Sequence, residues 1–412
     1  MSSNSEQASL IFDPFSPEFH NNPYPTYDWL REHDPIHWSF MQAWVITSYR
    51  DVEALLKASQ LQIDDLPMRL RQKSQYLKQW DFECLARTIE NWLFFMEPPH
   101  HTKLKGLVAK AFTPNAIELL RPAIAQSVEQ LLTLAEEKAR QNGGEIDVMT
   151  DFAAPLPAMT VTQILGIPIS DHDKLMRWSY DLFFVFDQPM SLTGYQKQNA
   201  IAIEAREYLV NLMTTQPTGL IGQLMSARDQ DLQLSEDQIL GFCIMLLIVG
   251  QETTKSLIGN SVLALLQHPQ ALSELQQNLD LVPVVIEELL RYDSPVQVIA
   301  RIAKEDFDYG GKTIHAGDKV ILCLGAANRD AETFPEPNQI NFHRRNYNLP
   351  FGGGLHYCLG AALARVQGQI AIRHLIERYP HLKLKSLNQS ALHWRESITL
   401  RGLTNLSVDL AI

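Results

Sequence analysis

Hydrophobic positions that recur every three or four residues dominate the middle of the chain. In residues 114–141, Ile117, Leu120, Ile124 and Val128 fall on one face of a helix, and Leu131 continues that face. Shorter stretches repeat the spacing and are closed by proline, glycine or polar residues, at 160–168, 208–216 and 269–279. The pattern predicts a helical body.

The longest helical pattern begins at Ser235 and is stopped by Pro269. Ser235 followed by Gln238 forms a capping box, which is typical of a helix N-terminus. The helix would hold about 33 residues and measure roughly 50 Å. Its segment 242–250 is apolar nearly all round, which predicts burial at the centre of the protein. Nine apolar residues are too few to span a bilayer.

Short runs rich in valine, isoleucine and tryptophan bracket this body and predict strands joined by glycine-containing turns. These runs lie at 35–48, 296–303, 306–324 and 397–410. The expected fold class is therefore mainly α with a minor β portion. The sequence has no repeats, low-complexity tracts or glycine/serine linker. We expect a single domain over residues 1–412, with a flexible polar segment at 1–20.

Composition indicates in which cellular compartment the protein works and which kinds of partner it does not bind. The formal charge is -12, which argues against a nucleic-acid partner and against attraction to anionic lipid. The four cysteines include no CxxC pair, so a structural zinc site is not expected. Few cysteines, a polar proline-broken start and no apolar anchor predict a soluble, cytoplasmic protein.

One cysteine, Cys358, lies between a glycine-rich loop and a helix expected to begin at Leu359. The N–H groups at such a helix start would point at the sulfur and favour a thiolate. Glycines before it let the backbone approach a flat ligand closely. Two interpretations are open from these residues: a packing cysteine at a loop–helix junction, or a metal ligand.

Three further patterns combine residues that carry chemistry. Glu252 and Thr253 interrupt the apolar centre of the long helix, either as a polar notch at a kink or as proton-handling groups beside a groove opened by Gly250. Glu288 and Arg291 stand three apart on a helix, where they can pair, commonly at the surface. His101 and Lys105 fall one turn apart, and their simplest interpretation is a solvated basic face. These are the residues His101, Lys105, Gly250, Glu252, Thr253, Glu288 and Arg291.

The spacing of Phe351, Gly354, His356, Cys358 and Gly360 resembles the heme-binding loop of the cytochrome P450 family. Residues 249–254 resemble the AGxET signature of that family, with valine in place of alanine. Residues 288–291 resemble its ExxR pair, and 101–105 its HxxxR motif, with lysine replacing arginine. All four occur in the family's order. The family usually adds a basic residue in the region 334–342, where this chain has glutamine at 339.

The resemblance implies heme b, with Cys358 as the iron ligand and Phe351 shielding the sulfur. It implies that the heme propionates are held by His101, Lys105, Arg301 and His356, and that Gly360 belongs to the cofactor-binding loop. Thr253 and Glu252 would deliver protons to bound oxygen. The resemblance treats Glu288 and Arg291 as a buried structural pair.

The implied activity is a monooxygenase that inserts one oxygen atom from O2 into a hydrophobic small molecule of secondary metabolism. Electrons would come from a ferredoxin- or flavodoxin-type donor and its NAD(P)H reductase, docking at basic residues such as Lys103, Arg344 and Arg345. The substrate cavity would be formed by the variable regions 61–95 and 171–200. Candidate wall residues are Val249, Val298, Ile299, Ile398 and Phe94.

Two rival functions remain. A peroxide-dependent peroxygenase would need no reductase, but the presence of both Glu252 and Thr253 argues against it. A non-enzymatic heme-thiolate sensor would normally carry an output segment, and none is visible in the sequence.

Overall fold

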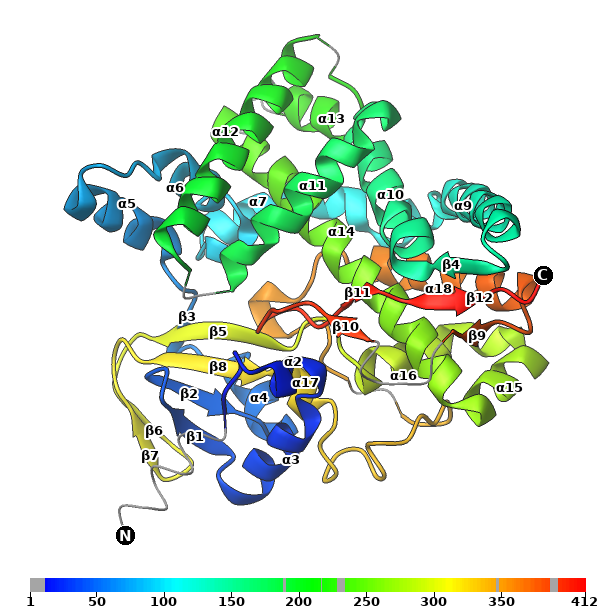
Figure 1. The fold of residues 1–412 in the computed structure, drawn as a ribbon. Coiled ribbons are helices and arrows are strands. Elements are labelled where there is room, and N and C mark those ends of the chain that lie inside the picture. Colours follow the sequence, from blue (N-terminus) through cyan, green and yellow to red (C-terminus); the bar gives the residue numbers. More distant parts are fainter. Residues whose placement is uncertain (1–11, 188–189, 216, 228–233, 346–347, 386–391) are drawn as a thin grey trace.

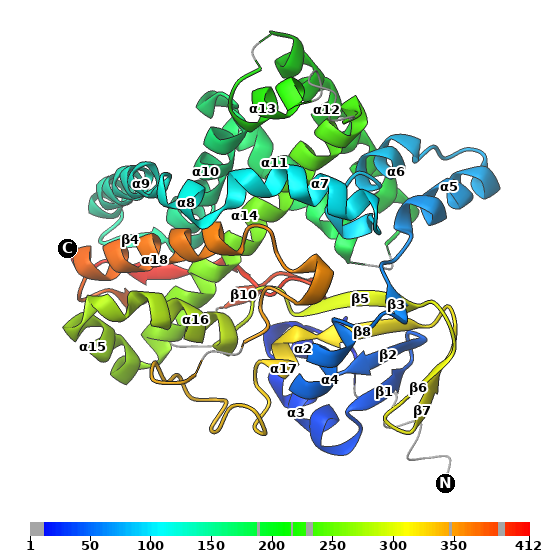
Figure 2. The ribbon, with the colours of Figure 1, turned by 180° about the vertical axis from the view of Figure 1, so that it is seen from behind.

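The computed structural model describes residues 12–187, 190–215, 217–227, 234–345, 348–385 and 392–412. Helices make up most of the fold, and a smaller part built around one sheet lies below them in both views (Figure 1; Figure 2). The expected mainly α fold with a minor β portion is confirmed. The helices are α2 (Pro17–Asn21), α3 (Tyr24–His33), α4 (Tyr49–Leu55), α5 (Leu66–Leu77), α6 (Glu83–Ile89), α7 (His100–Val108), α8 (Pro114–Glu118), α9 (Arg121–Gln141), α10 (Pro155–Leu165), α11 (His172–Leu182), α12 (Leu192–Thr215), α13 (Gly219–Ala227), α14 (Glu236–Gln267), α15 (Pro269–Gln277), α16 (Val282–Tyr292), α17 (Leu324–Ala327) and α18 (Ala361–Arg378).

Shorter helical turns connect several of these helices. They are η1 (Leu93–Phe95), η2 (Ala109–Phe112), η3 (Met149–Ala153), η4 (Ile169–Asp171), η5 (Phe183–Phe186), η7 (Leu279–Leu281) and η8 (Gly354–His356). The strands are β1 (Ile36–Ser39), β2 (Ala43–Ile46), β3 (Leu61–Gln62), β4 (Glu145–Asp147), β5 (Val298–Ala303), β6 (Phe307–Tyr309), β7 (Lys312–Ile314), β8 (Lys319–Cys323), β9 (Lys383–Leu384), β10 (His393–Trp394), β11 (Leu403–Asn405) and β12 (Ser407–Asp409).

The largest sheet joins strands that are far apart in the sequence. Its order is β1-β2-β8-β5-β3. β2 runs parallel to β8, with Val45 opposite Ile321, and β5 runs antiparallel to β8, with Arg301 opposite Val320. This pairing fixes the side of the sheet from which β5 side chains project, because successive residues of a strand point to opposite faces.

Helix α14 passes through the centre, between the upper helices and the sheet side (Figure 1; Figure 2). Ser235 and Gln238 form the expected capping box, and the helix ends at Gln267, before Pro269. By length and hydropathy it is the one helix of the described residues that could cross a membrane, but 78% of its most apolar window is buried inside the protein. Protein packing therefore accounts for its apolar sequence.

Two segments form local structure that the sequence pattern did not predict. Of the segment 1–20, residues 1–11 lie outside the described residues, whereas the rest packs against the sheet side, with Phe12 and Phe19 buried. The pattern at 114–141 forms two helices instead of one. Thr113 caps α8, and Pro122 stands in the first turn of α9, where a proline suits a new helix start.

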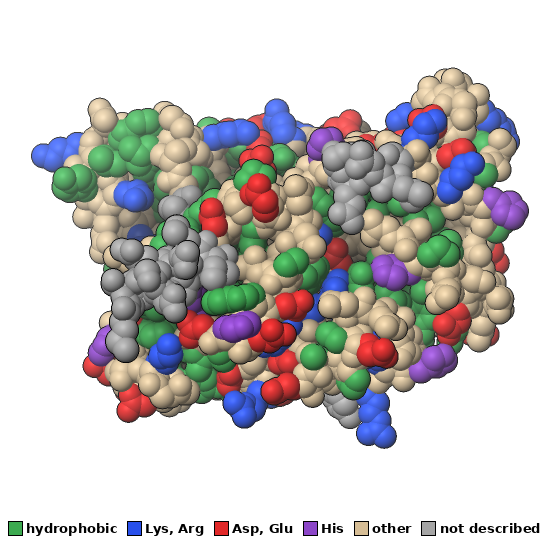
Figure 3. Space-filling model, turned by 60° about the horizontal axis from the view of Figure 1, so that its bottom comes forward, with side chains coloured by type: hydrophobic (Ala, Val, Ile, Leu, Met, Phe, Trp, Pro, Cys, Tyr) green, Lys and Arg blue, Asp and Glu red, His purple; other side chains and the backbone are tan. Residues whose placement is uncertain are grey.

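The surface carries mixed charge. On the face shown in Figure 3, acidic, basic and apolar side chains are interspersed. That face therefore offers no extended patch of a single charge, despite the formal net charge of -12.

Candidate functional site

The loop before Cys358 is held in a shape that only glycine tolerates. Gly354 has φ +63°, and a Cβ there would lie 2.7 Å from the carbonyl oxygen of Leu56. The Cys358 N–H then donates to the Phe351 carbonyl at 3.1 Å. Helix α18 begins at Ala361 with Gly360 as its cap, two residues later than the sequence pattern suggested.

Cys358 combines access with a crowded protein environment. It is exposed, whereas Cys243 and Cys323 are buried and Cys84 is intermediate. Burial raises the pKa of the Cys358 thiol, and the N–H groups of Gly360 and Ala361 oppose this by lowering it. The sulfur therefore lies in a recess, with backbone donors aimed at it as the sequence predicted.

Lys105 bridges α7 and this loop. Its Nζ donates to the carbonyl oxygens of Leu355 at 2.6 Å and Tyr357 at 3.0 Å. Its positive charge also lowers the pKa of Cys358. An ammonium group lacks the planar fork of arginine, and here it holds the backbone on both sides of His356.

Four cationic or donor side chains meet beside the recess: His101, Lys105, Arg301 and His356. The rings of His101 and His356 have centroids 4.4 Å apart. Burial, followed by the charges of Arg301, His101 and Lys105, lowers the pKa of His356 to about 3. Burial also lowers the pKa of Arg301.

These donors are short of acidic partners. Nδ1 of His101 is buried and unpartnered among the described side chains, and Arg301 donates to the carbonyl of Ala300. Glu97 is the carboxylate whose charge reaches both of them. A buried cluster of this kind fits a doubly anionic ligand, so the residues present suit the two propionates of a heme.

The centre of α14 has one open face. Val249, Gly250 and Thr253 are partly exposed, although the helix on either side of them is buried. Thr253 Oγ1 donates to the Val249 carbonyl one turn earlier, at 2.8 Å, as expected for a threonine that bends a helix. Val249 and Thr253 therefore lie on an accessible face of an otherwise buried part of the helix.

Gly250 has a packing role that the sequence pattern did not predict. A Cβ at this position would lie 2.8 Å from Cγ2 of Val161 on α10. The absence of a side chain therefore permits the close approach of α10 to α14. Gly250 therefore has a packing role besides the expected one of opening a groove, which stays a prediction.

Glu252 is held by a residue that none of the sequence motifs includes. Its Oε2 lies 2.7 Å from Nη1 of Arg395, and both residues are 5% exposed. Lys255 Nζ lies 3.8 Å from the same oxygen. Arg395 also lies over the rings of Tyr180 and Phe184, at 4.4 and 4.2 Å. Its pairing was not predictable, because 143 residues separate it from Glu252.

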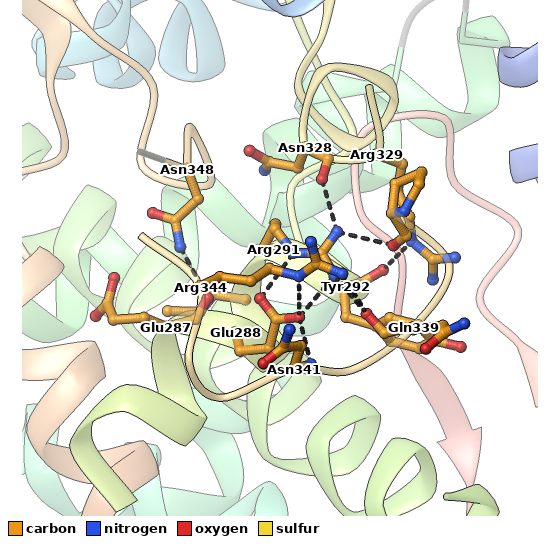
Figure 4. Close-up of polar contacts among 12 residues, drawn as sticks. Glu287, Glu288, Arg291, Tyr292, Asn328, Arg329, Gln339, Asn341, Arg344 and Asn348 are labelled. Carbon is orange, nitrogen blue, oxygen red and sulfur yellow. Dashed lines mark hydrogen bonds and ion pairs between the residues drawn. The ribbon is translucent and has the colours of Figure 1, made fainter. Parts of the chain in front are cut away.

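Glu288 and Arg291 form a buried pair, each 1% exposed, instead of a surface one. Arg291 donates to both carboxylate oxygens at 2.8 Å. It also reaches the carbonyls of Asn328, Pro337 and Gln339 (Figure 4). The pair therefore ties α16 to the irregular segment that leads to the cysteine loop.

Arg344 completes this network in place of a basic residue at 339. Its Nε donates to Glu288 Oε1 at 3.1 Å (Figure 4). Its other nitrogens reach the carbonyls of Pro335, Glu336 and Gln339. Gln339 contributes its backbone carbonyl, and its side chain bonds Glu336. The expectation that Arg344 is available for docking is wrong, because its side chain is 9% exposed and already paired.

The side chains predicted to line the substrate cavity do not all point to the same side of the protein. Val298 packs with Ile398 in the cluster around Phe12, whereas Ile299 packs against the cluster on the other face of β5. Ile299 therefore shares a face with Arg301. Phe94 is 42% exposed, and its ring contacts that of Phe186 at 5.4 Å.

Residues 194–399 match the family model described as Cytochrome P450. The chain belongs to the cytochrome P450 family. It is 34% identical to the polyketide biosynthesis cytochrome P450 PksS of Bacillus subtilis (strain 168), over 98% of this chain and 99% of that protein. It is 37% identical to the biotin biosynthesis cytochrome P450 of the same strain, over 92% of this chain and 93% of that protein. A solved structure of P450BioI in complex with an acyl carrier protein ligated to hexadec-9Z-enoic acid superposes with a TM-score of 0.86 at 34% identity, covering 96% of this chain and all of that one.

Membership settles the class of chemistry. The protein is a heme-thiolate monooxygenase with heme b as its cofactor, and it uses O2, a redox partner and a hydrophobic substrate. Its donor set fits that group, since one accessible cysteine sulfur lies beside a cationic cluster. Within the described ranges no group of three or more histidine, cysteine or acidic side chains could hold a metal ion.

Proposed function

We propose that this P450 inserts one oxygen atom from O2 into a hydrophobic small molecule of secondary metabolism. A ferredoxin- or flavodoxin-type donor and its NAD(P)H reductase would supply the electrons. The observation that carries the proposal is the accessible Cys358 sulfur with two N–H groups directed at it. The biosynthetic names of two relatives support the metabolic assignment. We place the protein in the cytoplasm, because it has few cysteines and all four are free thiols.

Cys358 is the proposed iron ligand, and the residues around it set the charge on the sulfur. When bound, heme iron activates O2 after it receives electrons, and an anionic sulfur assists cleavage of the O–O bond. The N–H groups of Gly360 and Ala361 stabilise the anion. Arg365 lies over the Phe351 ring at 4.4 Å, which fixes the aromatic side chain proposed to shield the sulfur.

His101, Lys105, Arg301 and His356 are the proposed propionate-binding residues. The unpartnered Nδ1 of buried His101 supports this role, because a buried donor without a partner is costly. Arg301 provides the fork that suits a carboxylate. Lys105 contributes charge while its Nζ holds the loop carbonyls.

Thr253 and Glu252 are the proposed proton-delivery pair. Thr253 lies on the open face of α14, and while its hydroxyl donates to the Val249 carbonyl, its oxygen can accept a hydrogen bond from a water. Glu252 is one residue away, in an ion pair with Arg395. To carry a proton the carboxylate must exchange Arg395 for water, so we assign Arg395 a positioning role.

The substrate would be bound by apolar and aromatic side chains next to that open face. Val249 supports this from α14, and Ile299 supports it from the Arg301 face of β5. Phe94 joins a ring cluster with Phe186 that links the two variable regions. Ile398 lines a separate cavity of about 510 Å³ together with Phe184. Val298 is the weakest candidate because it faces the Phe12 cluster.

The redox partner would dock on the side of the molecule nearest the sulfur. Lys103 is exposed on α7, two residues from the lysine that touches the cysteine loop, and Arg345 is exposed next to the buried Arg344. A partner with an acidic surface would be attracted to these charges, and added salt should slow the reduction.

The decisive experiment combines spectroscopy with turnover of the heme-loaded protein. Cys358→Ser should abolish the thiolate-type spectrum of the reduced carbon monoxide complex, and its retention would refute ligation by Cys358. With a substrate found by its low-to-high-spin shift, Thr253→Ala should form less product per NADPH consumed while keeping that spectrum. Unchanged coupling in Thr253→Ala would refute its proton role.

The same assay separates the rival functions. Product formed with hydrogen peroxide but not with ferredoxin, its reductase and NADPH would identify a peroxygenase. Tight ligand binding without turnover by any redox pair would identify a sensor.

A further inference from the structure

The cavity of about 510 Å³ lies where both ends of the chain meet the middle helices. Its lining comes from the N-terminal segment, from α11 and η5, from the start of α12 and from the segment after β10. Phe15, Phe184 and Ile398 supply apolar surface, and Asp187 supplies a carboxylate. We call it the Asp187 cavity.

The charged side chains of this lining are mostly acidic. Asp181, Asp187 and Glu396 are acids, and Lys197 is the one base besides His20 among the described lining residues. Lys197 Nζ lies 2.7 Å from Asp181 Oδ1, so its charge is already balanced. Asp187 and the exposed Glu396 therefore give the cavity a negative charge, which would attract a cation and repel an anion.

One oxygen of Asp187 lacks a hydrogen-bond partner. Oδ1 accepts the backbone N–H of Thr399 at 3.0 Å, whereas Oδ2 is buried and unpartnered within the described part of the chain. Burial raises the pKa of this carboxyl group, and hydrogen bonds from Ser397 and Thr399 oppose the rise without cancelling it. A buried carboxylate oxygen without a donor is costly, and a cationic N–H group is the donor that binds it most strongly.

Apolar side chains predicted to line the substrate cavity lie next to this carboxylate. Asp187 directly follows Phe186, whose ring contacts that of Phe94 from the other variable region. Ile398 lines the Asp187 cavity and packs in the same cluster as Val298 of β5. A hydrophobic molecule bound to these side chains would have one end within reach of Asp187.

We propose that the Asp187 cavity binds a positively charged, N–H-bearing end of the substrate, with Asp187 Oδ2 as the acceptor. The substrate class is thus a hydrophobic amine or guanidine. The inference rests on the proposed monooxygenase function and adds the chemistry of the substrate's polar end. Neither Cys358 nor Thr253 lines the cavity, so the cation is held away from the proposed site of oxidation. Oxidation should therefore occur at carbons remote from the nitrogen.

Three probes with the same chain test the preference for a cation: decylguanidinium, decanol and decanoate, each below its micelle concentration. A guanidinium has donors but no acceptor, so it does not ligate iron. In calorimetry with the heme-loaded protein, decylguanidinium should bind about tenfold more tightly than decanol, because a charge-assisted hydrogen bond forms. Decanoate should bind most weakly. A guanidinium that binds no more tightly than decanol overturns the proposal.

Asp187→Asn tests the anchor, since asparagine keeps an acceptor for the Thr399 N–H and loses the charge. The preference for decylguanidinium over decanol should disappear, while the affinity for decanol stays the same. Asp181→Asn is the matched control, because it removes one acid from the same lining, but one that is bound to Lys197. It should keep most of the preference. Equal losses in the two variants overturn Asp187 as the anchor.

The position of oxidation separates this inference from the proposed function. With a redox partner, the wild-type enzyme should oxidise decylguanidinium at carbons remote from the guanidinium, and Asp187→Asn should spread the product over more positions. Oxidation next to the guanidinium, or of decanol alone, overturns the inference and leaves the monooxygenase function in place. If the calorimetric preference holds but no redox pair supports oxidation of any probe, the proposed function fails and the cation site stands.

Discussion

Arg344 donates to Glu288 at 3.1 Å and thereby brings a second guanidinium to a carboxylate already held by Arg291. The same side chain bonds three backbone carbonyls between residues 335 and 339. Arg344 thus fastens the segment before the cysteine loop to helix α16. The network keeps its second ion pair although residue 339 is a glutamine, because Arg344, five positions later, supplies the positive charge.

Loss of Arg344 should therefore loosen the heme-binding region. Arg344→Met leaves a buried carboxylate with one partner fewer and frees three carbonyls, so we expect a loss of about 3 kcal/mol in the free energy of unfolding. Urea unfolding and the ratio of Soret to protein absorbance measure stability and heme retention. Arg345→Met is the matched control, since Arg345 is exposed, and it should change stability by less than about 0.5 kcal/mol. Equal losses in the two variants would argue against the network.

The ion pair between Glu252 and Arg395 should matter for both stability and coupling. Arg395→Met leaves Glu252 buried with only the more distant Lys255, so we expect the protein to lose about 3 kcal/mol of stability. Adding Glu252→Gln to Arg395→Met removes the unpaired charge and should restore part of that loss. A double-mutant cycle by urea unfolding measures the coupling energy between the two residues. A coupling energy near zero would show that Arg395 stabilises only through its contacts with Tyr180 and Phe184.

Local sequence patterns predicted much of this molecule because their physical causes are local. The capping box of α14, the back-bonded Thr253 and the N–H groups aimed at Cys358 each depend on residues within a few positions. The Glu288–Arg291 pair was likewise predictable as a pair, since its members lie one helical turn apart.

What the sequence could not predict depends on long-range contacts. Arg395 meets Glu252 from 143 positions away, and the clash that excludes a side chain at Gly250 comes from Val161 on another helix. The prediction that Arg344 lies at the surface was wrong for the same reason. A basic residue near the cysteine is expected at the surface unless its carboxylate partner, here Glu288, is known. Val298 and Ile299 are adjacent in sequence but face different clusters, which only the sheet pairing decides.

Lys105 should be required for the state of the sulfur as well as for the shape of the loop. Lys105→Met removes two hydrogen bonds and a charge that lowers the pKa of Cys358. The thiol pKa should therefore rise, and the pH midpoint of Cys358 alkylation in heme-free protein should move to higher pH. Lys103→Met, two residues away and exposed, should leave that midpoint unchanged. Lys105→Arg should keep most of the effect on the pKa. A midpoint unaffected by Lys105→Met would mean that the lysine acts on the loop alone.

Gly250→Ala should destabilise the protein although alanine favours helices. The new Cβ would lie 2.8 Å from Val161, and overpacking of this kind costs about 1–3 kcal/mol, more than the propensity gain of about 1 kcal/mol. Gly106→Ala is the control, since nothing lies within 4 Å of a Cβ at that helical position, and it should stabilise the protein slightly. Val161→Ala combined with Gly250→Ala should relieve the overlap. If Gly250→Ala and Gly106→Ala unfold alike in urea, the close approach of α10 and α14 is not the reason for the glycine.

The heme-free protein should lose stability in mild acid through His356. Burial and neighbouring cations lower the pKa of this imidazole to about 3 from an ordinary 6.5, so the folded state keeps it neutral where the unfolded state protonates it. The stabilising contribution is fully present above about pH 6.5 and is lost as the pH falls toward 3. His101 shifts in the same direction. His356→Asn should therefore flatten the dependence, by about 1 kcal/mol between neutral pH and about pH 5 in urea unfolding, a figure reduced for partial solvent screening. His343→Asn serves as the control because that side chain is 75% exposed. In the loaded enzyme, the anionic propionates that we propose to bind at these rings should oppose the shift, so the acid sensitivity should diminish when heme is bound.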